Sequence, residues 1–185
     1  MNKSAFIVEG HLEQYFIQAT CPGRPVRRLE CNGHNVSVAA IAKRIMTHCH
    51  LFNNNYYPII VMIDREDRHE TSTQICSLIL SEVRGLGITD NIIIGIADRM
   101  IENWILADPD IINQCQNKIK DVPAASYEGF LGKNIISQYL RSYQETTDGV
   151  DLLLKCRASH IKNSSPSFAD FCTRLPKNNC HWLKR

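Results

Sequence analysis

The sequence predicts an α/β protein with a mostly parallel sheet flanked by helices. Residues 59–64 (IIVMID) and 92–97 (IIIGIA) are apolar almost throughout. A continuously apolar strand is typical of a parallel sheet that is covered on both faces. Between the two runs, residues 70–84 carry apolar side chains at helical spacing. Strand–helix units that repeat in this way predict a doubly wound sheet with right-handed crossovers.

The first half of the chain begins with a similar unit. Residues 5–8 form a short apolar run, Gly10 allows a turn, and the following segment HLEQYFIQA has helical spacing. The segment 21–35 is predicted to be a loop with one strand in 26–31, and 36–50 a helix capped by Asn35 or Ser37. The break NNNYYP precedes the strand 59–64.

The second half of the chain is more helical and more polar. A helix containing MIENWILAD follows the strand 92–97, and further helices are predicted at 133–143, 149–157 and 167–175. We therefore expect one domain, in which residues 1–110 form the core and 111–185 a helical C-terminal extension packed on it.

The composition of the chain is that of an ordinary globular protein. The chain has 185 residues, of which 44% are hydrophobic and 22% charged, as in an ordinary globular domain. Its net charge of +2 does not by itself indicate nucleic-acid binding. The eight cysteines include no CxxC pair and are expected to be buried thiols. A zinc site made of Cys31, His34, Cys49 and His50 is the less favoured alternative.

The chain is expected to be cytoplasmic. Its start, MNKSAFIVEG, lacks the apolar stretch of a signal peptide. No stretch reaches the roughly 18 apolar residues that span a membrane.

Acidic residues follow three separate apolar strands. Glu9 ends the first, Asp64, Glu66 and Asp67 follow the second, and Asp98 and Glu102 follow the third. Ligands bind beyond the carboxyl ends of the strands in open α/β sheets. If the chain stays extended, Asp64 and Glu66 point the same way. Converging carboxylates predict a site for Mg²⁺ or Mn²⁺, whereas the alternative is polar capping of strand ends.

These motifs resemble those of the Toprim superfamily, and in particular its OLD-like and RloB-like branch in bacterial anti-phage defence. The resemblance lies in FIVEG, IDREDR, RMIENWILAD and SPSFADF, in this order. It implies a Toprim-like (Rossmann-like) core, with Glu9 as metal ligand or general acid/base and Asp64 as the first acidic residue of a DxD motif. Glu66 departs from that motif, so Asp67 is an alternative ligand. Glu102 would complete a second metal site.

A polyanionic substrate would require basic residues, and for Lys133 the resemblance implies a role. Lys133 matches a lysine that stabilises charge in the transition state, the alternative being an exposed surface lysine. Arg65 and Arg68 either reach phosphates or pair with neighbouring acids, and Arg24, Arg27 and Arg28 either contact a nucleic-acid backbone or an acidic partner. Trp104 is expected in the core, and Asp98 and Asp108 as capping residues.

The predicted function is that of a Mg²⁺-dependent nuclease acting on DNA or RNA. The chain has no GxxxxGK[ST] motif, so the resemblance implies a separate ABC-type ATPase as partner. The alternative is a catalytically inactive binding or regulatory subunit, which the departure at Glu66 motivates. A homo-oligomer is compatible with the sequence. The nucleic acid, its sequence preference, the oligomeric state and the trigger stay open.

Overall fold

The computed structural model describes residues 3–31 and 36–176 and contains a four-stranded sheet in this part of the chain. The strands are β1 (Lys3–Val8), β2 (Val26–Arg28), β3 (Tyr56–Asp64) and β4 (Ile92–Ala97). Their order is β2-β1-β3-β4, and every neighbouring pair is parallel. The α/β class and the parallel sheet predicted from the apolar runs are thereby confirmed.

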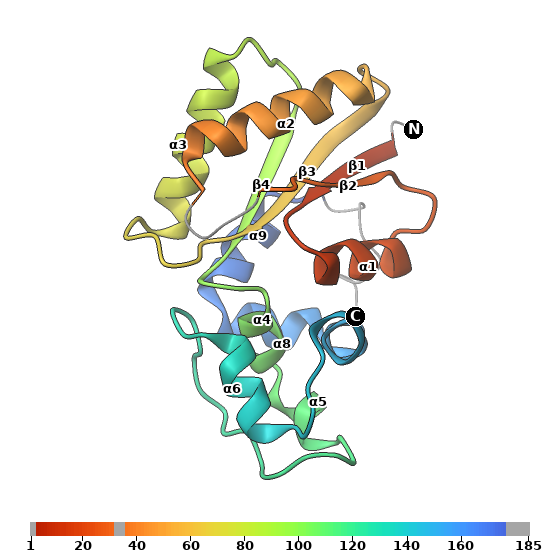
Figure 1. The fold of residues 1–185 in the computed structure, drawn as a ribbon, viewed down its shortest axis with the longest axis vertical. Coiled ribbons are helices and arrows are strands. Elements are labelled where there is room, and N and C mark those ends of the chain that lie inside the picture. Colours follow the sequence, from red (N-terminus) through yellow and green to blue (C-terminus); the bar gives the residue numbers. More distant parts are fainter. Residues whose placement is uncertain (1–2, 32–35, 177–185) are drawn as a thin grey trace.

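Helices cover the two faces of this sheet (Figure 1). The helix α1 (His11–Thr20) lies on one face, and α2 (Val38–Phe52) and α3 (Ser72–Gly85) lie on the other. Side chains of β1 alternate accordingly: Phe6 packs in the cluster that contains Phe16 of α1, and Ile7 in the cluster that contains Ile45 of α2. Because β1, β3 and β4 are buried on both faces along most of their length, these three strands have no polar face.

The caps of α2 and α3 explain where these helices begin. Ser37 Oγ accepts a hydrogen bond from Ala40 N at 3.3 Å, so Ser37 is the cap of α2, and Asn35 lies outside the described residues. Thr71 and Gln74 form a reciprocal capping box at α3, with N–H···O distances of 3.2 and 2.8 Å. Each cap satisfies backbone N–H groups that have no partner inside the helix.

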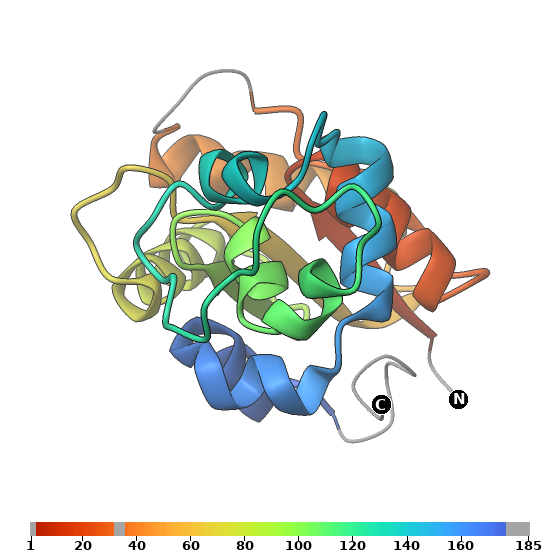
Figure 2. The same cartoon turned by 90° about the horizontal axis from the view of Figure 1, so that it is seen from below.

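The second half of the chain is helical, as expected, but in shorter pieces. The helices are α4 (Glu102–Leu106), α5 (Pro109–Asn113), α6 (Gly132–Tyr139), a π-helical turn η1 (Glu145–Gly149), α7 (Val150–Lys155), α8 (Ala158–Ser164) and α9 (Pro166–Arg174). The sequence did not predict η1 or α8 as separate elements. In the view from below, α4 lies at the centre with later helices around it (Figure 2).

The helical extension returns to the sheet through α9. Phe171 of α9 packs so closely on Gly95 of β4 that a Cβ at Gly95 would lie 2.5 Å from the Phe171 ring. Phe171 also stacks on Trp104 at a centroid distance of 6.0 Å, and Phe168 meets Trp104 edge-on at 5.0 Å. Trp104 is therefore a core residue, as predicted, and one continuous cluster joins the extension to the sheet.

No helix in the described part of the chain is both long enough and apolar enough to cross a membrane.

Candidate active site

The order of the strands places the topological switch point of the sheet between β1 and β3. From β1 the chain moves to β2 on one side and then crosses to β3 on the other. The helices that follow β1 and β3, namely α1 and α3, lie on opposite faces of the sheet. In open α/β sheets, such a reversal of strand order separates the adjacent loops and leaves a ligand-binding crevice at the carboxyl ends. Glu9 and Asp64 stand at the two sides of this crevice.

Glu9 and Asp64 are joined by a direct hydrogen bond. Asp64 N donates to Glu9 Oε2 at 2.7 Å, and Glu9 N donates to Met62 O at 3.1 Å. Two residues 55 positions apart in the sequence are thus held side by side. Burial raises the pKa of Glu9, and the negative charge of Glu66 raises it further.

Asp64 carries a buried oxygen without a partner. Its Oδ1 is enclosed and accepts no hydrogen bond within the described structure. Burial raises the pKa of Asp64 well above its usual value, and the charges of Glu13 and Glu9 add to the effect. A buried acceptor without a donor is costly unless a ligand or an ion satisfies it.

Glu66 lies near this pair, but not in the way that strand alternation predicts. The strand β3 ends at Asp64, and Glu66 adopts a left-handed backbone with φ of 55°. The chain does not stay extended after Asp64, so the condition under which Asp64 and Glu66 were expected to point the same way is not met. Glu66 N donates to Arg99 O at 2.9 Å, which ties the loop after β3 to the loop after β4. Its carboxylate lies 3.9 Å from Arg68.

The remaining charges of the IDREDR segment are paired locally. Asp67, whose side chain is 59% exposed, forms an ion pair with Arg99, and Arg65 pairs with Asp98. Arg68 Nη1 donates to Arg65 O at 2.9 Å. For Arg65 the structure shows pairing with a neighbouring acid. Asp67 is directed to Arg99, which favours Glu66 as the second acidic residue of the site.

A second group of acids lies deeper, beside the first. Glu13 and Glu102 are each only 4% exposed. Burial raises the pKa of Glu13 to about 8, and the carboxylates of Glu9, Glu102 and Glu145 raise it as well. Burial likewise raises the pKa of Glu102 to about 7, with Glu145 adding to the shift and Lys133 opposing it. Arg99, one helical turn before Glu102 in the sequence, pairs with Asp67 and not with Glu102.

Glu13 and Glu145 were missed by the sequence analysis. Glu13 lies on the buried face of α1 next to Leu12, Phe16 and Ile17. Its Oε2 accepts a hydrogen bond from Gly10 N at 3.1 Å. A glutamate among the apolar positions of an amphipathic helix was the available signal. Glu145 comes from η1, which no periodicity in the sequence indicates.

Lys133 lies at the edge of this acidic group. Its Nζ is 2.8 Å from Glu145 Oε2, and half of its side chain is exposed. The helix α6 is brought here by Gly132, where a Cβ would lie 2.9 Å from Glu102 Cβ and 2.2 Å from Asn103 Oδ1. Lys133 is therefore beside Glu102 in space, although 31 positions separate them in the sequence.

The two late segments that carried the sequence resemblance meet each other. Trp104 Nε1 donates to Ser167 Oγ at 3.2 Å, and Asp98 N donates to the same oxygen at 3.3 Å. Glu128 accepts hydrogen bonds from Ser165 Oγ and, at 2.9 Å, from Ser167 N. These contacts fix the loop after β4, and the position of Glu102 depends on that loop.

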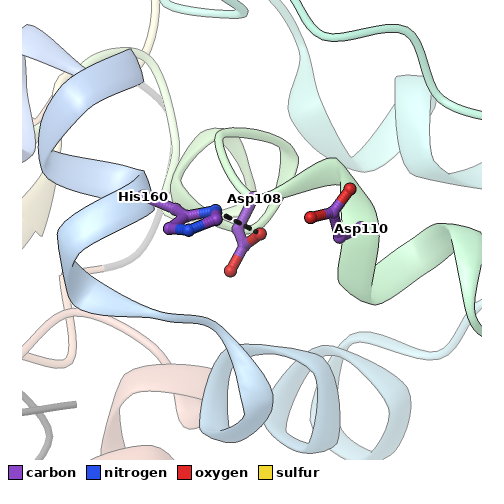
Figure 3. A group of neighbouring side chains, drawn as sticks. All are labelled: Asp108, Asp110 and His160. Carbon is purple, nitrogen blue, oxygen red and sulfur yellow. Dashed lines mark ion pairs between the residues drawn. The ribbon is translucent and has the colours of Figure 1, made fainter.

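A different cluster is formed by Asp108, Asp110 and His160 (Figure 3). In the described residues, this is the only group of three such side chains whose ligand atoms all lie within 4.8 Å of one another, so no three of the strand-end carboxylates are that close together. Arg157 Nη2 is 2.5 Å from Asp108 and 2.6 Å from Asp110. Burial alone would raise the pKa of Asp108, but Arg157 outweighs it and the pKa is lowered. The guanidinium of Arg157 therefore already offsets part of the negative charge of this cluster.

The cysteines of the described residues are all free thiols. Burial raises the pKa of the Cys49 thiol to about 12, which disfavours the thiolate that zinc needs. His50, next to it, is exposed. His34, the remaining histidine of the alternative zinc site, lies outside the described residues. Cys180, which was not part of that site, also lies outside them.

Fold and site together define an α/β protein with a parallel sheet and an acidic crevice at its topological switch point. Residues 6–176 match the model of a family described as Domain of unknown function (DUF4276), and the chain belongs to this family. No curated protein and no solved structure matches the chain.

Proposed function

We propose that this protein hydrolyses phosphodiester bonds of nucleic acid with Mg²⁺ or Mn²⁺ held at the carboxyl ends of β1 and β3. The observation that carries the proposal is the unpartnered, buried Oδ1 of Asp64 beside Glu9, in a crevice where further carboxylates gather. Such a site is incomplete without a cation.

The residues present fit a hard divalent ion. Carboxylate oxygens are the ligands that Mg²⁺ and Mn²⁺ prefer, and Mg²⁺ keeps several waters, so it needs few protein ligands. Glu9, Asp64 and Glu66 would hold a first ion, and Glu102 with Glu13 a second. Asp67 is left outside this set because it pairs with Arg99.

Each residue has a role that follows from its surroundings. A bound ion of this kind supplies Lewis acidity and a coordinated water of lowered pKa. Glu9 orients the end of β3 through its hydrogen bond to Asp64 N. Burial raises the pKa of Glu102 to about 7 in the metal-free protein, so Glu102 would release a proton when it binds the second ion. Lys133 is half exposed and can place its charge on a phosphate.

The setting of this activity is proposed from the sequence resemblance to OLD-like and RloB-like Toprim proteins. We propose that the protein acts in the cytoplasm as the effector of an anti-phage defence system, together with a separate ABC-type ATPase. The motifs FIVEG, IDREDR, RMIENWILAD and SPSFADF support this setting. RMIENWILAD and SPSFADF contact each other through the hydrogen bond from Trp104 to Ser167, so both segments contribute to the same part of the structure.

A second candidate is a binding or regulatory module without catalysis. It is favoured by the left-handed backbone at Glu66, and by the finding that no three strand-end carboxylates lie within 4.8 Å of one another in the described structure. Both candidates keep the same crevice and differ in what happens to the bound nucleic acid.

Cleavage assays test the catalytic proposal. Glu9→Gln and Asp64→Asn should each reduce Mg²⁺- or Mn²⁺-dependent cleavage of DNA or RNA by at least about a hundredfold, because each removes charge from the site. The matched control is Glu70→Gln, an exposed residue of the loop after β3, which should cleave like the wild type. Full cleavage by both folded site variants would reject the assignment.

Metal titration separates the catalytic proposal from an inactive module without metal. Mg²⁺ at about a hundred times its Kd should stabilise the wild type against unfolding by about 2.7 kcal/mol. Asp64→Asn should lose this effect, whereas Asp110→Asn, in the cluster paired with Arg157, should keep it. A wild-type melting temperature that does not respond to Mg²⁺ or Mn²⁺ would favour the inactive module.

A further inference from the structure

The loop before α6 has a rigidly held backbone. Phe130 N donates to Tyr127 O at 3.2 Å, and Phe130 O accepts from Asn103 Nδ2 at 3.0 Å. Arg99 Nη1 donates to Gly129 O at 3.3 Å. The loop is thus bonded to the residues that flank Glu102 on both sides in the sequence.

Despite this anchoring, the loop exposes two large apolar side chains. Phe130 is 55% exposed and Leu131, next to it, is 41% exposed. A fixed backbone keeps an aromatic ring in one place, so ordering this loop costs little when a ligand binds. Exposed aromatic side chains on a rigid support indicate a binding surface.

The position of this surface indicates what binds there. Gly132 follows directly and contacts Glu102 and Asn103, so the exposed pair adjoins the acidic group of the candidate active site. Two basic side chains are close to this pair. Arg99 donates to Gly129 O and is paired with Asp67. Lys133, two residues after Leu131, is half exposed and paired with Glu145. Proteins bind single-stranded nucleic acid with exposed aromatic side chains close to basic ones, and such basic side chains can exchange a carboxylate partner for a phosphate.

We propose that Phe130, with Leu131 beside it, is a stacking surface for a base next to the scissile phosphate, and that the substrate is therefore single-stranded at this point. This inference rests on the proposed function. Bases of an intact duplex are stacked on each other and cannot lie on the ring, whereas each base of a single strand offers a free face.

Equilibrium binding tests the inference, with the metal-loaded full chain and Ca²⁺ in place of Mg²⁺. Fluorescence anisotropy would compare a labelled short single strand, the same strand without bases, and the matched duplex. Phe130→Ala should weaken binding of the base-containing strand about tenfold, and Phe130→Trp should retain it. The strand without bases should bind all variants equally.

The matched control is Tyr57→Ala. Tyr57 is 53% exposed, nearly as much as Phe130. It lies near the amino end of β3, whereas the candidate active site is at the carboxyl ends of the strands. This variant should bind the single strand like the wild type. Circular dichroism would verify that each variant is folded.

Two results would overturn the inference. One is equal wild-type affinity for the strands with and without bases. The other is a folded Phe130→Ala variant whose affinity stays within about twofold of the wild type, which would assign the surface to a protein partner. A cleavage assay in Mg²⁺ tests the proposed function separately from the stacking surface. If binding depends on Phe130 but the wild type cleaves nothing, the stacking surface is supported and the nuclease proposal is rejected. If the wild type cleaves and Phe130→Ala does not change the cleavage, the nuclease proposal is supported and the stacking surface is rejected.

Discussion

At the scale of the residue, the acids of the crevice are defined by burial beside like charges. Glu13 and Glu102 are almost fully enclosed, and the neighbouring carboxylates raise their pKa values further. A carboxyl group in such surroundings stays protonated to a higher pH than usual, or keeps its charge by binding a cation. The same residues therefore make the metal-free protein sensitive to pH.

We predict that the metal-free protein loses stability as the pH rises. The folded-state pKa of Glu13, about 8, exceeds its usual 4.5, so the folded state binds more protons than the unfolded state between these values. Stability is full below about pH 4.5 for this group and falls as the pH rises toward 8. Glu13→Gln should reduce the loss by at least about 1 kcal/mol.

Urea unfolding in a chelating buffer at the two ends of this range would measure the effect. Glu70→Gln, at an exposed position, should lose stability as the wild type does. A Glu13→Gln variant whose stability falls in parallel with the wild type would contradict the prediction.

At the scale of the element, the caps decide where α3 begins and hence how the loop after β3 is held. Thr71 and Gln74 satisfy backbone N–H groups at the first turn of α3. The loop that precedes this cap carries Glu66 and Asp67, so a well-defined helix start limits the conformations of the site.

We predict that Thr71→Ala destabilises the protein by about 1 kcal/mol, because the hydroxyl that accepts from Gln74 N is lost. Thr73→Ala, two residues further and exposed, is the control and should be neutral or slightly stabilising, since alanine favours the helix. Chemical denaturation measures both. Equal effects of the two substitutions would show that the cap contributes nothing specific.

At the scale of the whole molecule, the helical extension and the sheet share one core. Phe171 of α9 fills the space that Gly95 leaves on β4 and stacks on Trp104 at the base of the crevice. The extension also supplies Lys133 and Glu145 to the site. The two parts are therefore expected to unfold together.

We predict that Phe171→Ala lowers the free energy of unfolding by about 3–5 kcal/mol while unfolding stays a single transition. Leu51→Ala, at a side chain that is 66% exposed, should change it by less than about 0.5 kcal/mol. Far-ultraviolet circular dichroism and tryptophan fluorescence would follow the transition. Two separate transitions in the wild type would show that the extension is an independent unit.

Much of the fold was accessible from the sequence because it depends on local patterns. Continuous apolar runs indicated β3 and β4, and helical spacing indicated α1, α2 and α3. The short helices of the second half were less predictable, because helices such as α8, seven residues long, show less than two full turns of periodicity.

For the candidate site, the sequence determined which carboxylates follow apolar strands, and this placed Glu9 and Asp64 at one edge of a parallel sheet. Only the tertiary structure decided that Glu66 leaves the strand through a left-handed backbone, that Asp67 turns to Arg99, and that Glu13, Glu145 and Lys133 join the group. The physical reason is that the end of a buried strand is marked by its neighbours in the chain, whereas charge pairing and burial depend on residues brought together from distant segments.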